Sequence, residues 1–151
     1  DSQIYHPACS VSDVKLIQSD LDNHFTCATD SQMKFNVSKC EHLRLVCNSN
    51  PPALSYTMNS QQIAPVTVLK YRGIFIGNRL SFDHHILVTC SKTTRILHML
   101  MRKMKEAKTR TRITAYKTLC QPIMEYACHS WSPQLSRHKR MLENIYRKAF
   151  R

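Results

Sequence analysis

The apolar residues of this chain change their spacing part-way along the sequence, and this change constrains the fold more than any other feature. Up to about residue 86, one helical pattern is followed by short apolar stretches separated by turn-forming residues. From Ile86 onward the spacing is helical, as in the stripe Ile96, Leu97, Leu100 and Met104. We therefore expect an α+β fold, with short antiparallel strands covered by a helix and followed by an all-helical segment.

The first part of the chain is predicted to contain one helix and several short strands. Ser10 and Asp13 are typical of a helix N-cap and first turn. The apolar face of this helix consists of Val14, Ile17, Leu21 and Phe25. Leu43 and Leu45 are spaced to share one face of a strand, and further strands are expected around a turn near Asn59-Ser60 and through residues 66–76.

Three helices are predicted in the second part. The first carries the apolar stripe that begins at Ile96. The second covers residues 113–126 and is expected to kink at Pro122, because proline lacks the backbone donor that an interior helical position needs. The third is expected to be capped by Ser136.

Charge is divided unevenly between these two parts. Residues 1–62 contain 4 Lys and Arg against 6 acids, whereas residues 63–151 contain 18 against 4. Such asymmetry favours an electrostatic partner, with nucleic acid first and an anionic membrane second. A solvated basic surface without a partner accounts for the charge alone equally well.

Several other classes of function lack their sequence motifs. The only glycines are Gly73 and Gly77, so no glycine-rich phosphate loop is present, and no His-Glu-x-x-His or Gly-x-Ser-x-Gly motif occurs. The 7 cysteines include no Cys-x-x-Cys pair, which disfavours a zinc finger and a disulfide framework. With no long apolar run and no signal peptide, we expect an intracellular chain, nuclear or cytoplasmic, without a membrane partner.

A series of short motifs occurs in a fixed order along the chain. The longest is the run from Gln32 to Cys40, QMKFNVSKC, between the predicted helix and the first strand. The others lie at residues 17–21, 73–76, 80–86, 116–119, 122–127, 131–133 and 142–145. Together they resemble the C-terminal palm and thumb of reverse transcriptases from non-LTR retrotransposons of the LINE type, jockey-like in pattern, over nearly the whole chain.

The resemblance implies a palm remnant with its primer-grip hairpin in residues 1–86 and a thumb-like segment in residues 87–151. It implies a parent RNA-directed DNA polymerase that uses Mg²⁺, deoxynucleotides and an RNA/DNA template–primer. Asp1 would match the last metal-binding and catalytic aspartate of that family, but the other carboxylates have no match in the chain. A two-metal site needs several carboxylates, so we expect the chain alone to be inactive and to hold no cofactor.

The resemblance also implies roles for individual residues. Lys39 matches a lysine near the nucleotide phosphates that would protonate the leaving pyrophosphate, although a solvated lysine at a strand entrance explains it better from sequence alone. Arg72 and Gly73 fall in the primer grip, and Trp131 is expected to pack rather than to stack on a base.

Basic residues of the thumb-like segment would contact the phosphates of the template–primer without reading its sequence. These candidates are Arg95, Arg102, Lys103, Lys105, Lys108, Arg110 and Arg112. Two alternatives remain open. One is a non-catalytic nucleic-acid-binding module, and the other is a helical protein-interaction domain whose basic face meets an acidic partner.

Overall fold

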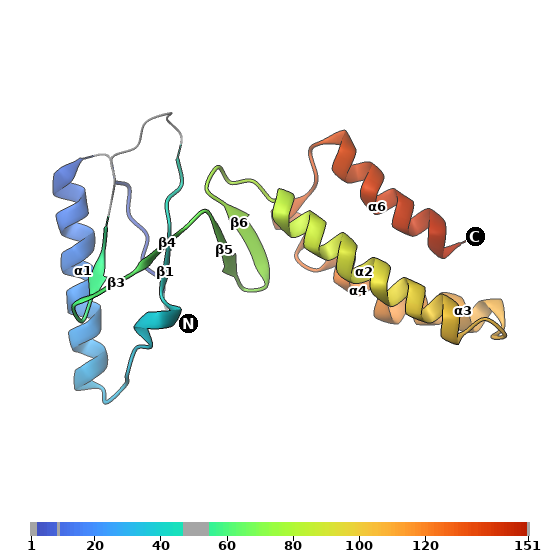
Figure 1. Cartoon of the computed structure of the whole chain (residues 1–151), viewed down its shortest axis with the longest axis horizontal. Coiled ribbons are helices and arrows are strands. Elements are labelled where there is room, and N and C mark those ends of the chain that lie inside the picture. Colours follow the sequence, from blue (N-terminus) through green and yellow to red (C-terminus); the bar gives the residue numbers. More distant parts are fainter. Residues whose placement is uncertain (1–2, 9, 47–54, 151) are drawn as a thin grey trace. The chain divides into compact units, whose positions relative to one another are not determined.

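The computed structural model describes residues 3–8, 10–46 and 55–150 (Figure 1). The chain forms two compact units, Asp1–Leu69 and Lys70–Arg151. Helices and short strand pairs occur together, and the predicted α+β class is confirmed. The functional division into residues 1–86 and 87–151 stays a prediction, while the compact units divide earlier, within the hairpin.

The first unit begins with a long helix whose start is fixed by its own sequence. Its elements are α1 (Val11–Asp30), η1 (Val37–Lys39), β1 (Glu41–Leu43), β2 (Thr57–Met58), β3 (Gln61–Gln62) and β4 (Ala64–Val66). The Ser10 hydroxyl accepts a hydrogen bond from the Asp13 amide at 3.3 Å, and the Asp13 carboxylate accepts one from the Ser10 amide at 2.8 Å. This capping box satisfies two amides that the helix cannot, so the predicted N-terminus is confirmed.

The apolar face of α1 packs against a small core of its own unit. Tyr56, Met58 and Ile63 are buried there, and all four predicted face residues of α1 contact them. The Gln18 side chain donates to the Thr57 carbonyl oxygen at 2.8 Å and accepts from the Thr57 amide at 3.1 Å. Gln18 thus gives β2 the two hydrogen bonds that a neighbouring strand would otherwise supply.

The strand pairs of the first unit differ in direction. Strands β2 and β3 are antiparallel and joined by Asn59 and Ser60, whose φ angles of 50° and 59° are typical of a tight hairpin turn. The predicted turn is therefore confirmed. Strands β1 and β4 pair in parallel, which the sequence pattern did not predict. The expectation for Leu45 was wrong, because β1 ends at Leu43 and the Leu45 side chain is exposed.

The second unit begins at Lys70, within a hairpin, and continues into packed helices. From this hairpin onward the elements are β5 (Val68–Tyr71), β6 (Ile74–Gly77), α2 (Asp83–Lys103), α3 (Thr109–Leu119), α4 (Gln121–Glu125), α5 (Cys128–Trp131) and α6 (Ser136–Ala149). Helix α2 packs against α6, and α3 and α4 also pack against α2 (Figure 1). The buried core residues are Ile86, Cys90, Leu97, Tyr116, Cys120, Trp131 and Ile145.

The helix boundaries of this unit follow local chemistry only in part. Proline divides the predicted second helix, since α3 ends at Leu119 and Pro122 lies in the first turn of α4, where a missing amide does no harm. The prediction that Ser136 caps the last helix was wrong by one position. Leu135 is the N-cap of α6 and makes no side-chain capping bond.

Trp131 anchors the core of the second unit. Its side chain is only 2% exposed, and its indole Nε1 donates to the Tyr126 carbonyl oxygen at 2.7 Å. The His85 ring meets the indole edge-on, with 5.0 Å between ring centroids. The expected packing role of Trp131 is thus consistent with its position, and His85 is held in the same core.

His85 makes the stability of the second unit sensitive to pH. Burial, with a smaller contribution from the charge of His84, lowers the pKa of His85 below its usual value. The His85 Nδ1 atom accepts a hydrogen bond from the Phe75 amide at 3.4 Å, and it can do so only while that nitrogen is unprotonated. The folded protein therefore favours neutral His85.

We expect the free energy of unfolding to fall as the pH drops below about 6.5, where His85 in the unfolded chain takes up a proton. Its contribution is fully present above that pH and is lost as the pH falls toward the lowered pKa of the folded state. Urea unfolding across this range should show a weaker pH dependence for His85→Gln than for the wild type. Identical pH dependence of the two proteins would contradict this assignment.

Candidate nucleic-acid interface

The seven predicted phosphate-binding cations lie in one continuous stretch of the second unit. Arg95, Arg102 and Lys103 belong to α2, Lys105 and Lys108 to the turn after it, and Arg110 and Arg112 to α3. All seven side chains are exposed. We call residues 95–112 the basic segment, and Glu106 is its only acidic residue.

The cations of the basic segment have no acidic partner in the described part of the chain. Ion pairs are found elsewhere in the unit, where Asp83 meets Arg137 at 3.2 Å. Arg147 likewise pairs with Glu143 at 3.5 Å. Two of the four acids of the second unit are therefore engaged away from the basic segment, and Glu106 alone offsets its seven cations from within.

The first turn of α3 lacks the side chains that stabilise a helix N-terminus. The N-cap residue Lys108 makes no side-chain capping bond, and the first turn holds Arg110 and Arg112 instead of acids. Positive charge at a helix N-terminus opposes the helix dipole, whereas an anion there is favourable. A bound phosphate would reverse this unfavourable arrangement, because free amides and cations would face it together.

The basic segment also carries a shallow hollow on the exposed side of α2. It is lined by Arg95, His98, Met101 and Arg102. Arg95 and Arg102 are seven positions apart, so they lie on the same face of the helix about two turns from each other. Two guanidinium groups with an apolar side chain between them suit a surface that meets phosphates and sugars.

The predicted primer-grip residues form the tip of the β5–β6 hairpin. Arg72 and Gly73 have φ angles of 45° and 85°, as a two-residue hairpin turn requires. The Tyr126 hydroxyl donates to the Arg72 carbonyl oxygen at 2.9 Å, so α4 fixes the hairpin tip. The Arg72 guanidinium lies over the Tyr71 ring, 5.5 Å from its centroid. No hydrogen bond, ion pair or ring contact among the described residues joins it to the basic segment.

Gly73→Ala is expected to lower the free energy of unfolding by roughly 1–2 kcal/mol, because a side chain disfavours this left-handed backbone. The added Cβ would also lie 3.3 Å from Cε1 of Tyr126. Urea unfolding would measure the loss. Arg79→Ala, at an exposed site nearby, is the control and should change stability by less than about 0.5 kcal/mol. Equal losses of stability in the two variants would contradict the requirement for a residue without a side chain at Gly73.

Of the two predicted catalytic residues, Lys39 and Asp1, the structure describes only Lys39. Lys39 is exposed at the end of η1, and the Asn36 carbonyl oxygen accepts its amide at 3.0 Å. The Asn36 side chain accepts the Ser38 hydroxyl at 2.6 Å, so Asn36 shapes this turn. Asp1 lies outside the described residues. The position of Lys39 fits a solvated lysine, and its role in pyrophosphate release stays a prediction.

The described residues offer no fit for a two-metal site. No group of three His, Cys, Asp or Glu side chains within residues 3–8, 10–46 and 55–150 could hold a metal ion. The thiols of Cys90 and Cys120 are buried, and burial raises the pKa of each, which keeps them protonated and weakly nucleophilic. We therefore derive no catalytic step from these residues.

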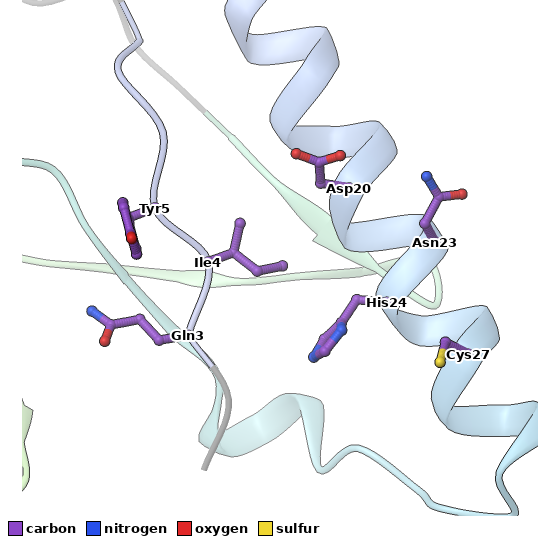
Figure 2. A pocket seen from close by; sticks show the side chains of 7 residues that line it. All are labelled: Gln3, Ile4, Tyr5, Asp20, Asn23, His24 and Cys27. Carbon is purple, nitrogen blue, oxygen red and sulfur yellow. The ribbon is translucent and has the colours of Figure 1, made fainter.

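A second hollow, which the sequence did not indicate, lies in the first unit (Figure 2). The N-terminal segment forms one wall, and α1 forms the other. The residues that line it are Gln3, Ile4, Tyr5, Asp20, Asn23, His24 and Cys27. The His24 ring packs against Phe35 with 5.2 Å between ring centroids, and its buried Nε2 atom has no hydrogen-bond partner among the described residues. With Asp20 as its only acid and no cation, this hollow has no phosphate-binding chemistry.

Comparison of the chain with protein-family models, with curated proteins and with solved structures finds no match. No helix within the described residues is long and apolar enough to cross a membrane. The functional proposal below therefore depends on the ordered sequence motifs and on the chemistry of the basic segment.

Proposed function

We propose that the chain is the C-terminal palm and thumb portion of a reverse transcriptase from a non-LTR retrotransposon, and that its own activity is to bind a template–primer duplex. The order of short motifs from residue 17 to residue 145 supports the family. The observation that carries the binding activity is the basic segment, whose seven exposed cations have no acidic partner among the described residues.

The composition of the basic segment favours contacts to the nucleic-acid backbone. It contains no Asn, Gln, Phe, Tyr or Trp, so the usual readers of adenine are absent from it and His98 is its only ring that could stack on a base. Lys and Arg bind phosphates of any sequence, and each neutralised phosphate releases counterions. The segment therefore supplies affinity that depends strongly on salt and weakly on sequence.

The test is a titration of an RNA–DNA hybrid with the purified chain at increasing salt concentration. The logarithm of the binding constant should fall steeply and linearly with the logarithm of the salt concentration. Two hybrids of equal length and unrelated sequence should bind alike, and polyglutamate should compete only weakly. A flat salt response would contradict binding through phosphate contacts, and strong competition by polyglutamate would instead support an acidic protein partner.

Primer extension provides a separate test of the proposed lack of catalysis. The chain alone is expected not to extend a primer with Mg²⁺ and deoxynucleotides, because Asp1 is the only match to the family's metal-binding carboxylates. The measurement is extension of a labelled primer on an RNA template. Template-dependent synthesis by the purified chain would overturn this expectation without affecting the binding proposal.

A further inference from the structure

Three aromatic rings meet where α3 and the end of α6 come together. Tyr116 belongs to α3, Tyr146 to α6, and Phe150 is the C-cap of α6. The ring centroids of Tyr146 and Phe150 lie 4.8 Å apart, and those of Tyr116 lie 6.2 Å from Tyr146 and 5.4 Å from Phe150. We call these three residues the aromatic cluster.

The aromatic cluster has a buried floor and an exposed top. Tyr116 is 4% exposed, whereas Tyr146 is 56% and Phe150 is 49% exposed. The floor holds the two upper rings in place, because edge-on contacts between aromatic rings are favourable. Two adjacent rings, tilted 47° to each other, thus pack on Tyr116 and are still accessible from outside, so that each can receive the face of a flat ligand.

The buried residue of the aromatic cluster, Tyr116, also carries a polar group without a partner among the described residues. The Tyr116 hydroxyl is buried and has no hydrogen-bond partner among the described residues. Burial, with smaller contributions from Cys120, Tyr146 and Glu125, raises the pKa of Tyr116, so the hydroxyl stays protonated and able to donate. Buried polar groups without a partner are rare in proteins, and this one belongs to a core residue whose ring contacts the two exposed rings.

Positive charge continues from the basic segment to the aromatic cluster. Arg112 precedes Tyr116 by four positions on α3, which places the two residues one turn apart on the same face. Arg147 and Lys148 lie between Tyr146 and Phe150 in the sequence, and all three cations are exposed, although Arg147 pairs with Glu143. Arg112 and Lys148 have no acidic partner among the described residues and remain available to phosphates of a strand that meets the exposed rings.

We propose that Tyr146 and Phe150 form a platform on which unpaired bases of the bound nucleic acid stack. This inference rests on the proposed function and adds to it a preference for nucleic acid that carries a single-stranded stretch. Base–aromatic stacking is independent of sequence, because every base has a π face. An acidic peptide would satisfy the cations but would gain little from two flat rings, so the aromatic cluster distinguishes nucleic acid from that partner.

The experiment compares two probes, a blunt RNA–DNA hybrid and the same hybrid with a short single-stranded deoxyadenosine overhang. The wild-type chain should bind the overhang hybrid roughly fivefold to a hundredfold more tightly, the range expected for one stacked base. Added salt should weaken both complexes while changing this ratio little, since stacking releases no counterions. Equal affinity of the wild type for the two probes would overturn the proposal.

Variants test whether the preference for the overhang hybrid depends on the rings of Tyr146 and Phe150. Replacing Tyr146 and Phe150 together with leucine keeps apolar bulk over Tyr116 but removes both π faces, and it should bring the ratio close to one. Exchanging the two residues, Tyr146→Phe with Phe150→Tyr, should preserve the ratio. Tyr5→Ala removes a ring that is 88% exposed in the first unit and serves as the control.

The outcomes separate this inference from the proposed function. Steep salt dependence with equal binding of the two probes retains the basic segment and rejects the platform. Preference for the overhang that survives the double leucine change also rejects the platform. Absence of binding to either probe rejects both proposals. Circular dichroism shows whether each variant is folded. If the leucine variant is not folded, the ratio of the wild-type affinities for the two probes decides whether the proposal stands.

Discussion

Neutralising Lys103, Lys105 and Lys108 together is expected to weaken binding of an RNA–DNA hybrid uniformly across sequences and to flatten the salt dependence by up to about three units of slope. The three side chains are exposed and flank the junction of α2 and α3. Each lysine that contacts a phosphate accounts for about one released counterion, so the change in slope counts the contacts that are lost. Fluorescence anisotropy with glutamine variants would measure it.

A comparison of two double variants, each of which removes two positive charges, tests whether the position of the lysines matters. The double variant Lys105→Gln with Lys108→Gln removes as much charge as Lys15→Gln with Lys34→Gln. Lys15 and Lys34 are exposed in the first unit, where acids outnumber bases, so their loss should change binding little. Equal losses from the two double variants would mean that the chain attracts nucleic acid by its net charge, without a defined surface.

Trp131→Ala is expected to cause the largest loss of stability, about 3–5 kcal/mol, because it removes the largest buried side chain of the second unit. The change also leaves the Tyr126 carbonyl oxygen without its 2.7 Å hydrogen bond and the His85 ring without its edge-on contact. Since Trp131 is the only tryptophan, circular dichroism during urea unfolding is the suitable measurement.

Two further changes test one hydrogen bond of Trp131 and one hydrogen bond of the neighbouring Tyr126 side chain. Trp131→Phe should cost less than the alanine change, because the ring still fills much of the space while the hydrogen bond to Tyr126 is lost. Replacing Tyr126 with phenylalanine should cost about 1 kcal/mol, the usual value of one hydrogen bond, through the lost bond to the Arg72 carbonyl oxygen. A Trp131→Ala protein as stable as the wild type would contradict this description of the core.

Features that depend on neighbours in the sequence could be predicted from the sequence. The Ser10–Asp13 capping box, the Asn59-Ser60 turn and the break at Pro122 each follow from residues within a few positions. The apolar face of α1 follows from its helical period in the same way. These elements have their cause in local chemistry, and the structure confirms them.

Features that depend on distant partners could not be predicted in this way. The parallel pairing of β1 with β4 joins residues 41–43 to residues 64–66, and no local pattern encodes that direction. Helix α6 begins without a side-chain cap, because its packing against α2 fixes its position. Local preference for a capping serine was therefore outweighed by tertiary contacts.

In the candidate site too, local features could be predicted from the sequence and long-range contacts could not. Exposure of the seven cations follows from their positions outside the apolar stripe of α2 and at the start of α3. The aromatic cluster could not be predicted in the same way, because nothing in the helical pattern of residues 113–126 links Tyr116 to α6. The spacing of Tyr146 and Phe150, four positions apart with Arg147 and Lys148 between them, was the available signal for an exposed aromatic and basic surface.

Photo-crosslinking of a bound RNA–DNA hybrid, followed by mapping of the crosslinked peptides, locates the binding surface on the chain. The hybrid should carry photoreactive groups along its backbone, and the experiment should use the full chain at low salt. We expect crosslinks to concentrate in residues 95–112 and to be displaced by unlabelled hybrid of any sequence. Crosslinks that concentrate in residues 3–46, or spread evenly over the chain, would contradict it.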